Sequence, residues 1–177
     1  LYAELLPFLD SIWLGEGFFY KKYSPEYMLA EVSGIPYGVT GQMLQDGGDL
    51  YEGMLYGMNN RFGWGYTNAT QMYKVWDDFG ITESRMLGYW HSENPIRTDN
   101  ENVLSTVYLK ENAALLCLYN FSGKKEKFNL KMYPALLGFE ISEASKIKFG
   151  KSRKRKINIY KSFSLGKRKG MIIYLRG

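Results

Sequence analysis

Residues 10–18 read Asp-Ser-Ile-Trp-Leu-Gly-Glu-Gly-Phe, and this run predicts a short buried strand that leads into a turn. The turn is flanked by Gly15 and Gly17, which favour a tight change of chain direction. A helix is predicted to end just before the strand, over residues 1–8. The run therefore indicates one repeat of a fold in which helices and short strands alternate.

The segments that follow keep this alternation up to about Arg97. Ser24-Pro25-Glu26 supplies an N-cap, a proline for the first helical position and an early acid, so a helix is predicted from there to about Ser33. Residues 37–44 fit either a short helix or an extended stretch. Residues 67–79 show helical spacing and end at Gly80, a natural C-cap.

A strand is then predicted over residues 85–90. Strand, helix and strand in this rhythm indicate βα units. A complete (β/α)8 barrel takes about 250 residues, more than the 177 residues of this chain. We therefore expect residues 1–97 to be the C-terminal portion of a TIM barrel.

After Pro95 the pattern changes to short runs of alternating polar and apolar residues separated by turn signals. This is typical of a small antiparallel β-sandwich, which we expect over residues 98–177. The boundary is predicted near residues 95–102. The predicted strands are residues 103–109, 113–121, 127–132, 145–149, 157–163 and 171–175.

Charge is unevenly distributed along the chain. Residues 144–177 hold 12 of the 23 Lys and Arg residues and none of the 18 Asp and Glu residues. The basic run Lys146–Lys156 is compatible with a solvated hairpin loop, and also with a surface that binds an anionic glycan or nucleic acid. Because nothing in residues 1–97 supports nucleic-acid binding, we do not expect a nucleic-acid partner.

Several other features limit the class of protein. Cys117, the single cysteine, lies in an apolar run and is predicted to be a small buried hydrophobe. No run reaches about 18 apolar residues, so no membrane span is expected. The start at Leu1, without an initiator Met or a signal-peptide pattern, suggests a fragment or a processed product.

Candidate site residues follow from where loops meet predicted strand ends. In an α/β barrel the functional groups sit at the C-terminal ends of the strands, which favours Glu16 over Asp10. Along an extended strand these two acids are about 20 Å apart. The carboxylate pair of a glycosidase is roughly 5–10 Å apart, so they cannot be each other's partner.

Aromatic side chains near strand ends can stack on the apolar face of a sugar ring, although each alone is more often part of a core. Those considered are Trp13, Tyr20, Trp64, Tyr66 and Trp90. Arg61 either binds a ligand or anchors its own loop. His91, the only histidine, excludes a metal site built from several His ligands. Asp46 and Asp49 flank two glycines and predict a polar turn rather than a metal loop, and no cofactor is expected.

Several motifs in order resemble a family of bacterial proteins similar to glycoside hydrolase family 123. The motifs are residues 10–18, Glu31-Val-Ser-Gly-Ile-Pro-Tyr-Gly, Met54-Leu-Tyr-Gly-Met, Leu87-Gly-Tyr-Trp and Thr98-Asp-Asn. The resemblance implies a parent protein with an N-terminal β-domain, a TIM barrel and a C-terminal β-sandwich that acts on glycans. It also suggests a periplasmic or extracellular location.

Characterised family members resemble enzymes that use an adjacent Asp-Glu pair, and no Asp-Glu dipeptide occurs in this chain. No catalytic residue is therefore carried over from the family. From its position alone, Glu16 is the candidate acid of a glycosidase fragment that is inactive as an isolated chain. One wall of the glycan cleft is predicted to consist of Trp13, Arg61, Trp64, Trp90 and His91.

Two further hypotheses compete with a glycosidase fragment, whose partner would be the upstream part of its own barrel. The chain could be a non-catalytic carbohydrate-binding or structural module in which the sandwich and its basic loop act. A weaker alternative is nucleic-acid binding through residues 146–169, which would make the affinity depend steeply on salt.

Overall fold

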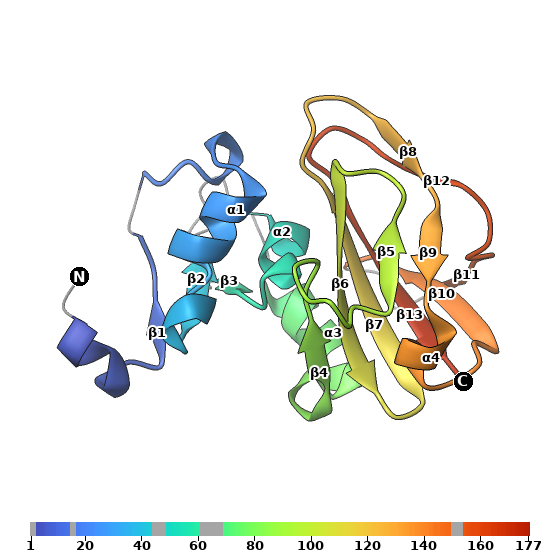
Figure 1. Cartoon of the computed structure of the whole chain (residues 1–177), viewed down its shortest axis with the longest axis horizontal. Coiled ribbons are helices and arrows are strands. Elements are labelled where there is room, and N and C mark those ends of the chain that lie inside the picture. Colours follow the sequence, from blue (N-terminus) through green and yellow to red (C-terminus); the bar gives the residue numbers. More distant parts are fainter. Residues whose placement is uncertain (1–2, 15–16, 44–48, 61–68, 150–153) are drawn as a thin grey trace. The chain divides into compact units, whose positions relative to one another are not determined.

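The computed structural model describes residues 3–14, 17–43, 49–60, 69–149 and 154–177 (Figure 1). The chain divides into two compact units, Leu1–Ala69 and Thr70–Gly177. We expected a boundary near residues 95–102. The division falls earlier because residues 70–87 contact the C-terminal sheet. None of the helices in the described ranges is long and apolar enough to cross a membrane.

The N-terminal unit alternates helices with short strands. Its elements are η1 (Ala3–Phe8), β1 (Ser11–Ile12), η2 (Tyr20–Lys22), α1 (Pro25–Tyr27), η3 (Met28–Val32), η4 (Ile35–Tyr37), β2 (Thr40–Met43), α2 (Leu50–Leu55) and β3 (Asn59–Asn60).

The helix predicted from Ser24 is confirmed. The Ser24 hydroxyl oxygen accepts a hydrogen bond from the Tyr27 backbone N–H at 3.3 Å, and Pro25 occupies the first helical position. The helix continues as the π-helical turn η3 and ends before Gly34, whose φ of 79° is left-handed. Both ends therefore follow from local sequence signals.

The three strands of the N-terminal unit form a parallel sheet in the order β1-β2-β3. Ser11 of β1 is paired with Thr40 of β2, and Gln42 of β2 is paired with Asn59 of β3. Of the two options for residues 37–44, the extended one is correct. Parallel neighbours joined by helical crossovers are βα units, which confirms the rhythm expected for this part of the chain.

The turn between η3 and β2 leaves no room for side chains at two glycines. A Cβ on Gly34 would lie 2.4 Å from the Val39 carbonyl oxygen, and one on Gly41 would lie 2.6 Å from the Ser33 carbonyl oxygen. Both neighbours are backbone atoms, which cannot rotate away. The close approach fixes how the helix is connected to the parallel sheet.

The C-terminal unit is mainly antiparallel β-structure. Its elements are α3 (Thr70–Phe79), η5 (Ile81–Glu83), β4 (Arg85–Leu87), β5 (Ile96–Thr98), β6 (Val103–Lys110), β7 (Ala113–Asn120), β8 (Glu126–Phe128), β9 (Leu130–Met132), α4 (Pro134–Leu137), β10 (Glu143–Ile147), β11 (Arg155–Lys156), β12 (Phe163–Leu165) and β13 (Gly170–Arg176).

A six-stranded sheet of order β11-β10-β13-β7-β6-β4 organises this unit. The prediction that residues 85–90 form a strand of the barrel is wrong. Strand β4 pairs antiparallel with β6, with Arg85 opposite Leu109 and Leu87 opposite Val107. The basic run lies in a hairpin as expected, since β10 and β11 pair antiparallel with Lys146 opposite Arg155.

The main core lies on one face of β6, β7 and β13, under the two short sheets β12-β8 and β5-β9. Burying each large apolar side chain contributes about 1.5–3 kcal/mol relative to exposure. Core members from four elements of the six-stranded sheet and from the segments above it include Val107, Leu116, Phe128, Ala144, Leu165 and Ile173.

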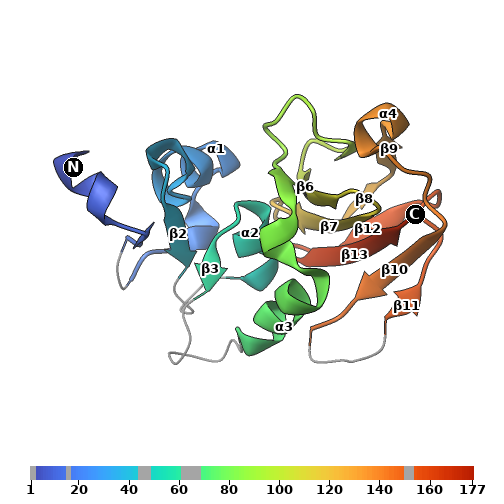
Figure 2. The same ribbon diagram turned by 90° about the horizontal axis from the view of Figure 1, so that it is seen from below.

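The opposite face of the same sheet is covered by α3 in Figure 2, which shows this helix on the other side from β8 and β9. The Phe79 ring of α3 contacts the Tyr174 ring of β13 edge-on, with centroids 6.2 Å apart. Lys110 of β6 donates to the Phe79 carbonyl oxygen at 3.2 Å. Cys117 of β7 has no exposed surface, which confirms the buried position expected for it.

The two left-handed glycines of the η3–β2 turn offer a matched test of the close approach. Gly34 and Gly38 both have positive φ, near 79° and 72°, but a Cβ on Gly38 would meet nothing within 4 Å. Replacing Gly38 with Ala should cost about 1–2 kcal/mol for the left-handed backbone. Replacing Gly34 with Ala should cost about 1–3 kcal/mol more because of the clash.

Urea unfolding of both variants measures this difference. Equal losses of unfolding free energy for Gly34→Ala and Gly38→Ala would show that the close approach at Gly34 does not stabilise the turn.

Candidate functional site

The carboxyl ends of β1, β2 and β3 point to one edge of the parallel sheet, because the strands run in the same direction. Trp13 follows β1 directly and is 44% exposed. Glu16, Arg61 and Trp64 also follow β1 and β3 in the chain, and they lie outside the described residues.

Two buried polar side chains of the N-terminal unit were not predicted from the sequence. Glu52 of α2 is 0% exposed and Asn60, the last residue of β3, is 1% exposed. Burying a carboxylate is costly unless it is compensated, so such groups are enriched at functional sites. The one available signal was the spacing of Asp49 and Glu52, since an acid three residues after a cap marks a helix start.

The side chain of Asn60 lies against α2. A Cβ built on Gly53 of α2 would be 2.8 Å from the Asn60 Oδ1 atom. Glycine in a helix interior costs about 1 kcal/mol relative to Ala, and here it makes room for this amide. Helix α2 begins where the Asp49 carboxylate accepts from the backbone N–H groups of Tyr51 and Glu52, at 2.9 and 3.3 Å. Asp49 is thus a capping residue, as expected for a polar turn.

Trp90 and His91 lie together in one turn of the C-terminal unit, after β4. The Trp90 ring packs on Gly88, where a Cβ would be 2.4 Å from the ring, and contacts Tyr89 edge-on with centroids 5.0 Å apart. The absence of a side chain at Gly88 therefore allows the Trp90 indole to pack on the backbone. Trp13 belongs to the other unit.

Three polar groups of His91 form hydrogen bonds at this turn. The His91 backbone N–H donates to the Gly88 carbonyl oxygen at 2.9 Å, and its Nδ1 accepts from the Glu93 backbone N–H at 3.2 Å. Its carbonyl oxygen accepts from the Arg97 guanidinium at 3.0 Å. Glu93 in turn forms an ion pair with Arg85. These bonds give His91 a defined structural role in the turn.

Asn94 holds the turn to the sheet and was not predicted from the sequence. Its side chain is fully buried, and its Nδ2 donates to the carbonyl oxygens of Leu87, Gly88 and Ser105 at 2.8–3.2 Å. Its Oδ1 accepts from the Ile96 backbone N–H at 3.0 Å. One side chain thus forms hydrogen bonds with the backbones of β4, β5 and β6.

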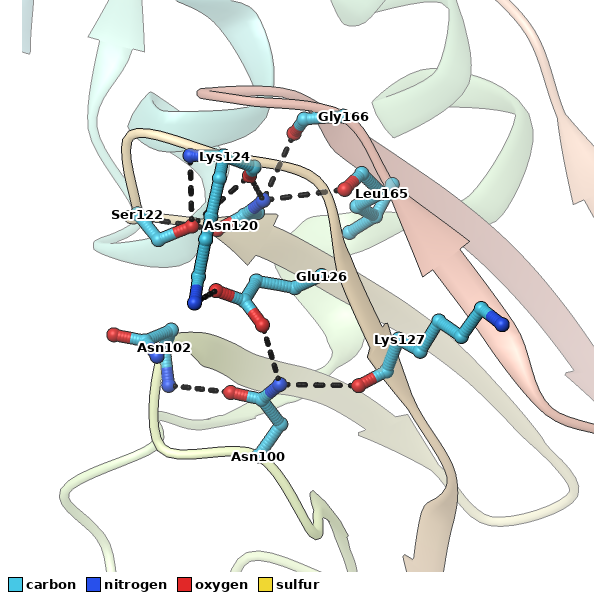
Figure 3. A network of polar contacts seen from close by, with 9 residues as sticks. All are labelled: Asn100, Asn102, Asn120, Ser122, Lys124, Glu126, Lys127, Leu165 and Gly166. Atoms are coloured by element: carbon cyan, nitrogen blue, oxygen red, sulfur yellow. Dashed lines mark hydrogen bonds and ion pairs between the residues drawn. The ribbon is translucent and has the colours of Figure 1, made fainter.

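A second polar network, shown in Figure 3, lies at the start of β8. Asn100 Nδ2 donates to Glu126 Oε2 and to the Lys127 carbonyl oxygen, both at 3.0 Å. Glu126 is 8% exposed, and Lys124 Nζ lies 4.0 Å from its Oε1. The hydrogen bond from Asn100 lowers the pKa of the Glu126 carboxyl below its ordinary value, and Ser122 and Lys124 act in the same direction.

The neighbouring Asn120 extends this network to β12. Its Nδ2 donates to the carbonyl oxygens of Lys124, Leu165 and Gly166 at 2.8, 3.2 and 2.9 Å. Amide side chains here tie loops to the sheet. Across the described ranges, no three His, Cys, Asp or Glu side chains lie together so that they could hold a metal ion. Asp46 lies outside those ranges.

Two family models match successive parts of the chain. The model of the TIM-barrel domain of glycoside hydrolase 123 matches residues 1–63, and the model of the C-terminal domain of glycoside hydrolase 123 matches residues 68–176. Together with the parallel N-terminal sheet and the antiparallel C-terminal unit, these matches define a glycosidase-like protein. The chain belongs to glycoside hydrolase family 123.

Likeness to solved structures is weak. A trehalose-6-phosphate hydrolase of Bacillus licheniformis matches with 14% identity and a TM-score of 0.38, over 62% of this chain and 18% of that chain. A mutant form of the same hydrolase in complex with PNG matches with the same values. The chain thus corresponds to less than a fifth of that enzyme's length. No curated protein matches significantly.

Removing the Asn94 side chain should destabilise the C-terminal unit strongly. Asn94→Leu keeps the branched shape but leaves the carbonyl oxygens of Leu87 and Ser105 and the Ile96 N–H without this partner, and each such group costs about 1–3 kcal/mol. We expect a loss of at least about 3 kcal/mol in chemical denaturation. Asn158→Leu is the control, because Asn158 is exposed and accepts one hydrogen bond, from Tyr160 N–H. Similar losses for both variants would refute the role of Asn94.

Acid should weaken the C-terminal unit partly through Glu126. Because the folded-state pKa of its carboxyl is lowered, its contribution is present above the unfolded pKa, about 4.3. It is lost as the pH falls through the lower folded pKa. Glu126→Gln should therefore flatten the fall in unfolding free energy between about pH 5 and pH 3. Some slope should remain, since Asn129 lowers the pKa of Asp99 as well.

Urea titrations at several pH values measure this slope. The exposed Glu140→Gln variant is the control and should keep the wild-type slope. A wild-type slope in Glu126→Gln would show that the bond from Asn100 does not favour the ionised carboxylate.

Proposed function

We propose that the chain is the C-terminal part of a glycoside hydrolase that cleaves glycans with acid assistance. In this proposal, the N-terminal unit supplies the last three strands of a (β/α)8 barrel and the C-terminal unit is a β-sandwich. The observation that carries the proposal is the parallel sheet β1-β2-β3, whose carboxyl ends are followed in the chain by Trp13, Glu16 and Arg61. Family membership agrees with this proposal.

The free side of β1 supports the idea that upstream barrel strands complete the sheet. Among the described residues, β1 pairs with β2 alone. An unpaired strand edge beside apolar surface needs a covering partner. Around β1 the exposed apolar side chains are Leu5 (51%), Phe8 (83%), Leu9 (44%), Trp13 (44%), Leu14 (48%) and Phe19 (61%).

The β-sandwich is supported by the position of the C-terminal core. Apolar residues of β6, β7 and β13 meet those of β8 and β12, so the core separates two layers of antiparallel strands. Inner-face residues that interleave between two sheets are typical of a sandwich.

In the proposed mechanism, Glu16 donates a proton to the leaving oxygen while positive charge develops on the sugar ring. A second carboxylate within roughly 10 Å is required, and the upstream strands would supply it. Trp13, with Trp64 and Arg61, would form one wall of the cleft. For Trp90 and His91, the bonds within their own turn favour an anchoring role over direct contact with the glycan. The isolated chain would be inactive.

The alternative is a non-catalytic carbohydrate-binding or structural module. It is favoured by the hairpin of β10 and β11, where Lys154, Arg155 and Lys156 are all exposed. Such a basic hairpin could hold an anionic glycan without any catalytic carboxylate. Nucleic-acid binding through the same hairpin would show itself as a steep fall in affinity with salt.

The upstream reading frame, joined to this chain, should hydrolyse one or more aryl glycosides from a panel. Glu16→Gln should lower kcat by about 10²–10⁴-fold, as is usual when a general acid is lost. Glu140→Gln, at an exposed position of the C-terminal unit, should leave kcat unchanged.

Hydrolysis that survives in Glu16→Gln would keep the glycosidase but remove Glu16 from the catalytic pair. A complete protein that cleaves nothing and yet is retarded on a glycan affinity gel would favour the binding module.

A further inference from the structure

A cavity of about 240 Å³ lies within the C-terminal unit, between α3 and the six-stranded sheet. It is on the face of the sheet opposite the main core, and all of its lining residues belong to the C-terminal unit. Its apolar walls come from Val75 and Phe79 of α3, Leu115 of β7, Ile147 of β10 and Tyr174 of β13. An apolar cavity of about 150 Å³ can bind benzene, so this one can hold a larger, substituted ring.

The floor of the cavity consists of buried apolar side chains. Leu115 is 0% exposed, while Phe79 and Ile147 are 8% and 9% exposed. The Phe79 and Tyr174 rings stand at 81° to one another, so they form two sides of a corner. A flat apolar group that enters this corner would contact one ring face and one ring edge, an arrangement that aromatic groups favour.

The rim of the cavity is basic. Among its described lining residues, Asp78 is the single acid, and it forms an ion pair with Lys74 at 3.3 Å. Two cations, Lys148 and Lys154, remain on the side of β10 and its hairpin. Lys154 Nζ lies 4.1 Å from the centroid of the Tyr174 ring, which places its charge directly over the apolar wall.

The two cations at this rim, Lys148 and Lys154, leave a positive potential that a bound anion would relieve. An apolar floor below a cationic rim is complementary to a molecule with an apolar body and a negative head.

We propose that this cavity binds a small aromatic carboxylate, with its ring in the corner of Phe79 and Tyr174 and its carboxylate at Lys148 and Lys154. A sugar would fit less well, because its hydroxyl groups would face the apolar side chains of Val75, Leu115 and Ile147. The site therefore serves a ligand distinct from the glycan of the proposed hydrolase. It does not depend on whether the chain is part of an enzyme.

Titration of the 177-residue chain with 1-naphthoate, followed by calorimetry, tests the proposal. We expect binding in the micromolar to millimolar range, and at least tenfold weaker binding of 1-naphthalenemethanol, which lacks the charge. The double variant Lys148→Gln/Lys154→Gln should weaken naphthoate at least tenfold and leave the neutral alcohol unaffected. Lys125→Gln/Lys161→Gln removes two exposed charges elsewhere and should change neither affinity.

A second variant tests the cavity itself. Val75 is only half-buried on α3, so Val75→Phe can fill the space without disturbing the main core. It should abolish naphthoate binding while the melting temperature stays within a few degrees of wild type. The proposal is overturned if naphthoate does not bind, if it binds no better than the alcohol, or if binding survives in either the Lys148→Gln/Lys154→Gln or the Val75→Phe variant.

Discussion

The structure of the C-terminal unit depends on β7, which is paired on both sides and buried on both faces. All eight of its residues pair with β6, and seven pair with β13. Its backbone groups are therefore satisfied within the sheet, which allows seven of its eight residues, 114–120, to be buried. One face of β7 then supports the main core through Leu116, and the other receives α3 and the cavity beside Leu115.

Helices and strands that depend on nearby residues could be predicted from the sequence. Those that depend on contacts with residues far along the chain could not. Ser24 and Gly80 mark the ends of helices through their own side chains or backbone, so α1 and α3 followed from the sequence. The sequence of a strand does not specify which strand it pairs with. Strand β4 was therefore assigned to the barrel sheet, whereas it pairs with β6. Helix α2 was not predicted from the sequence, because a glycine such as Gly53 favours a loop. In the structure, the missing side chain of Gly53 makes room for the side chain of Asn60.

The candidate site likewise has some features that could be predicted from the sequence and others that could not. That Trp13 follows a strand of a parallel sheet could be inferred from the βα rhythm. Burial of Glu52 and Asn60 could not be inferred, because an acid or an amide normally faces solvent. Trp90 and His91 were grouped with the cleft by their distance from a strand end alone. The bonds through Asn94 that fix their turn join residues up to eleven positions apart.

Both outer strands of the six-stranded sheet are short, and both carry charge. Strand β11 consists of the exposed pair Arg155 and Lys156, and β4 begins with the exposed, ion-paired Arg85. A second molecule that paired with either outer strand would have to desolvate its exposed cations. The few backbone hydrogen bonds that such short strands offer would not offset this cost. The short, charged outer strands thereby disfavour edge-to-edge pairing between molecules and fibre growth, even though the strands at the centre of the sheet are among the most apolar of the chain.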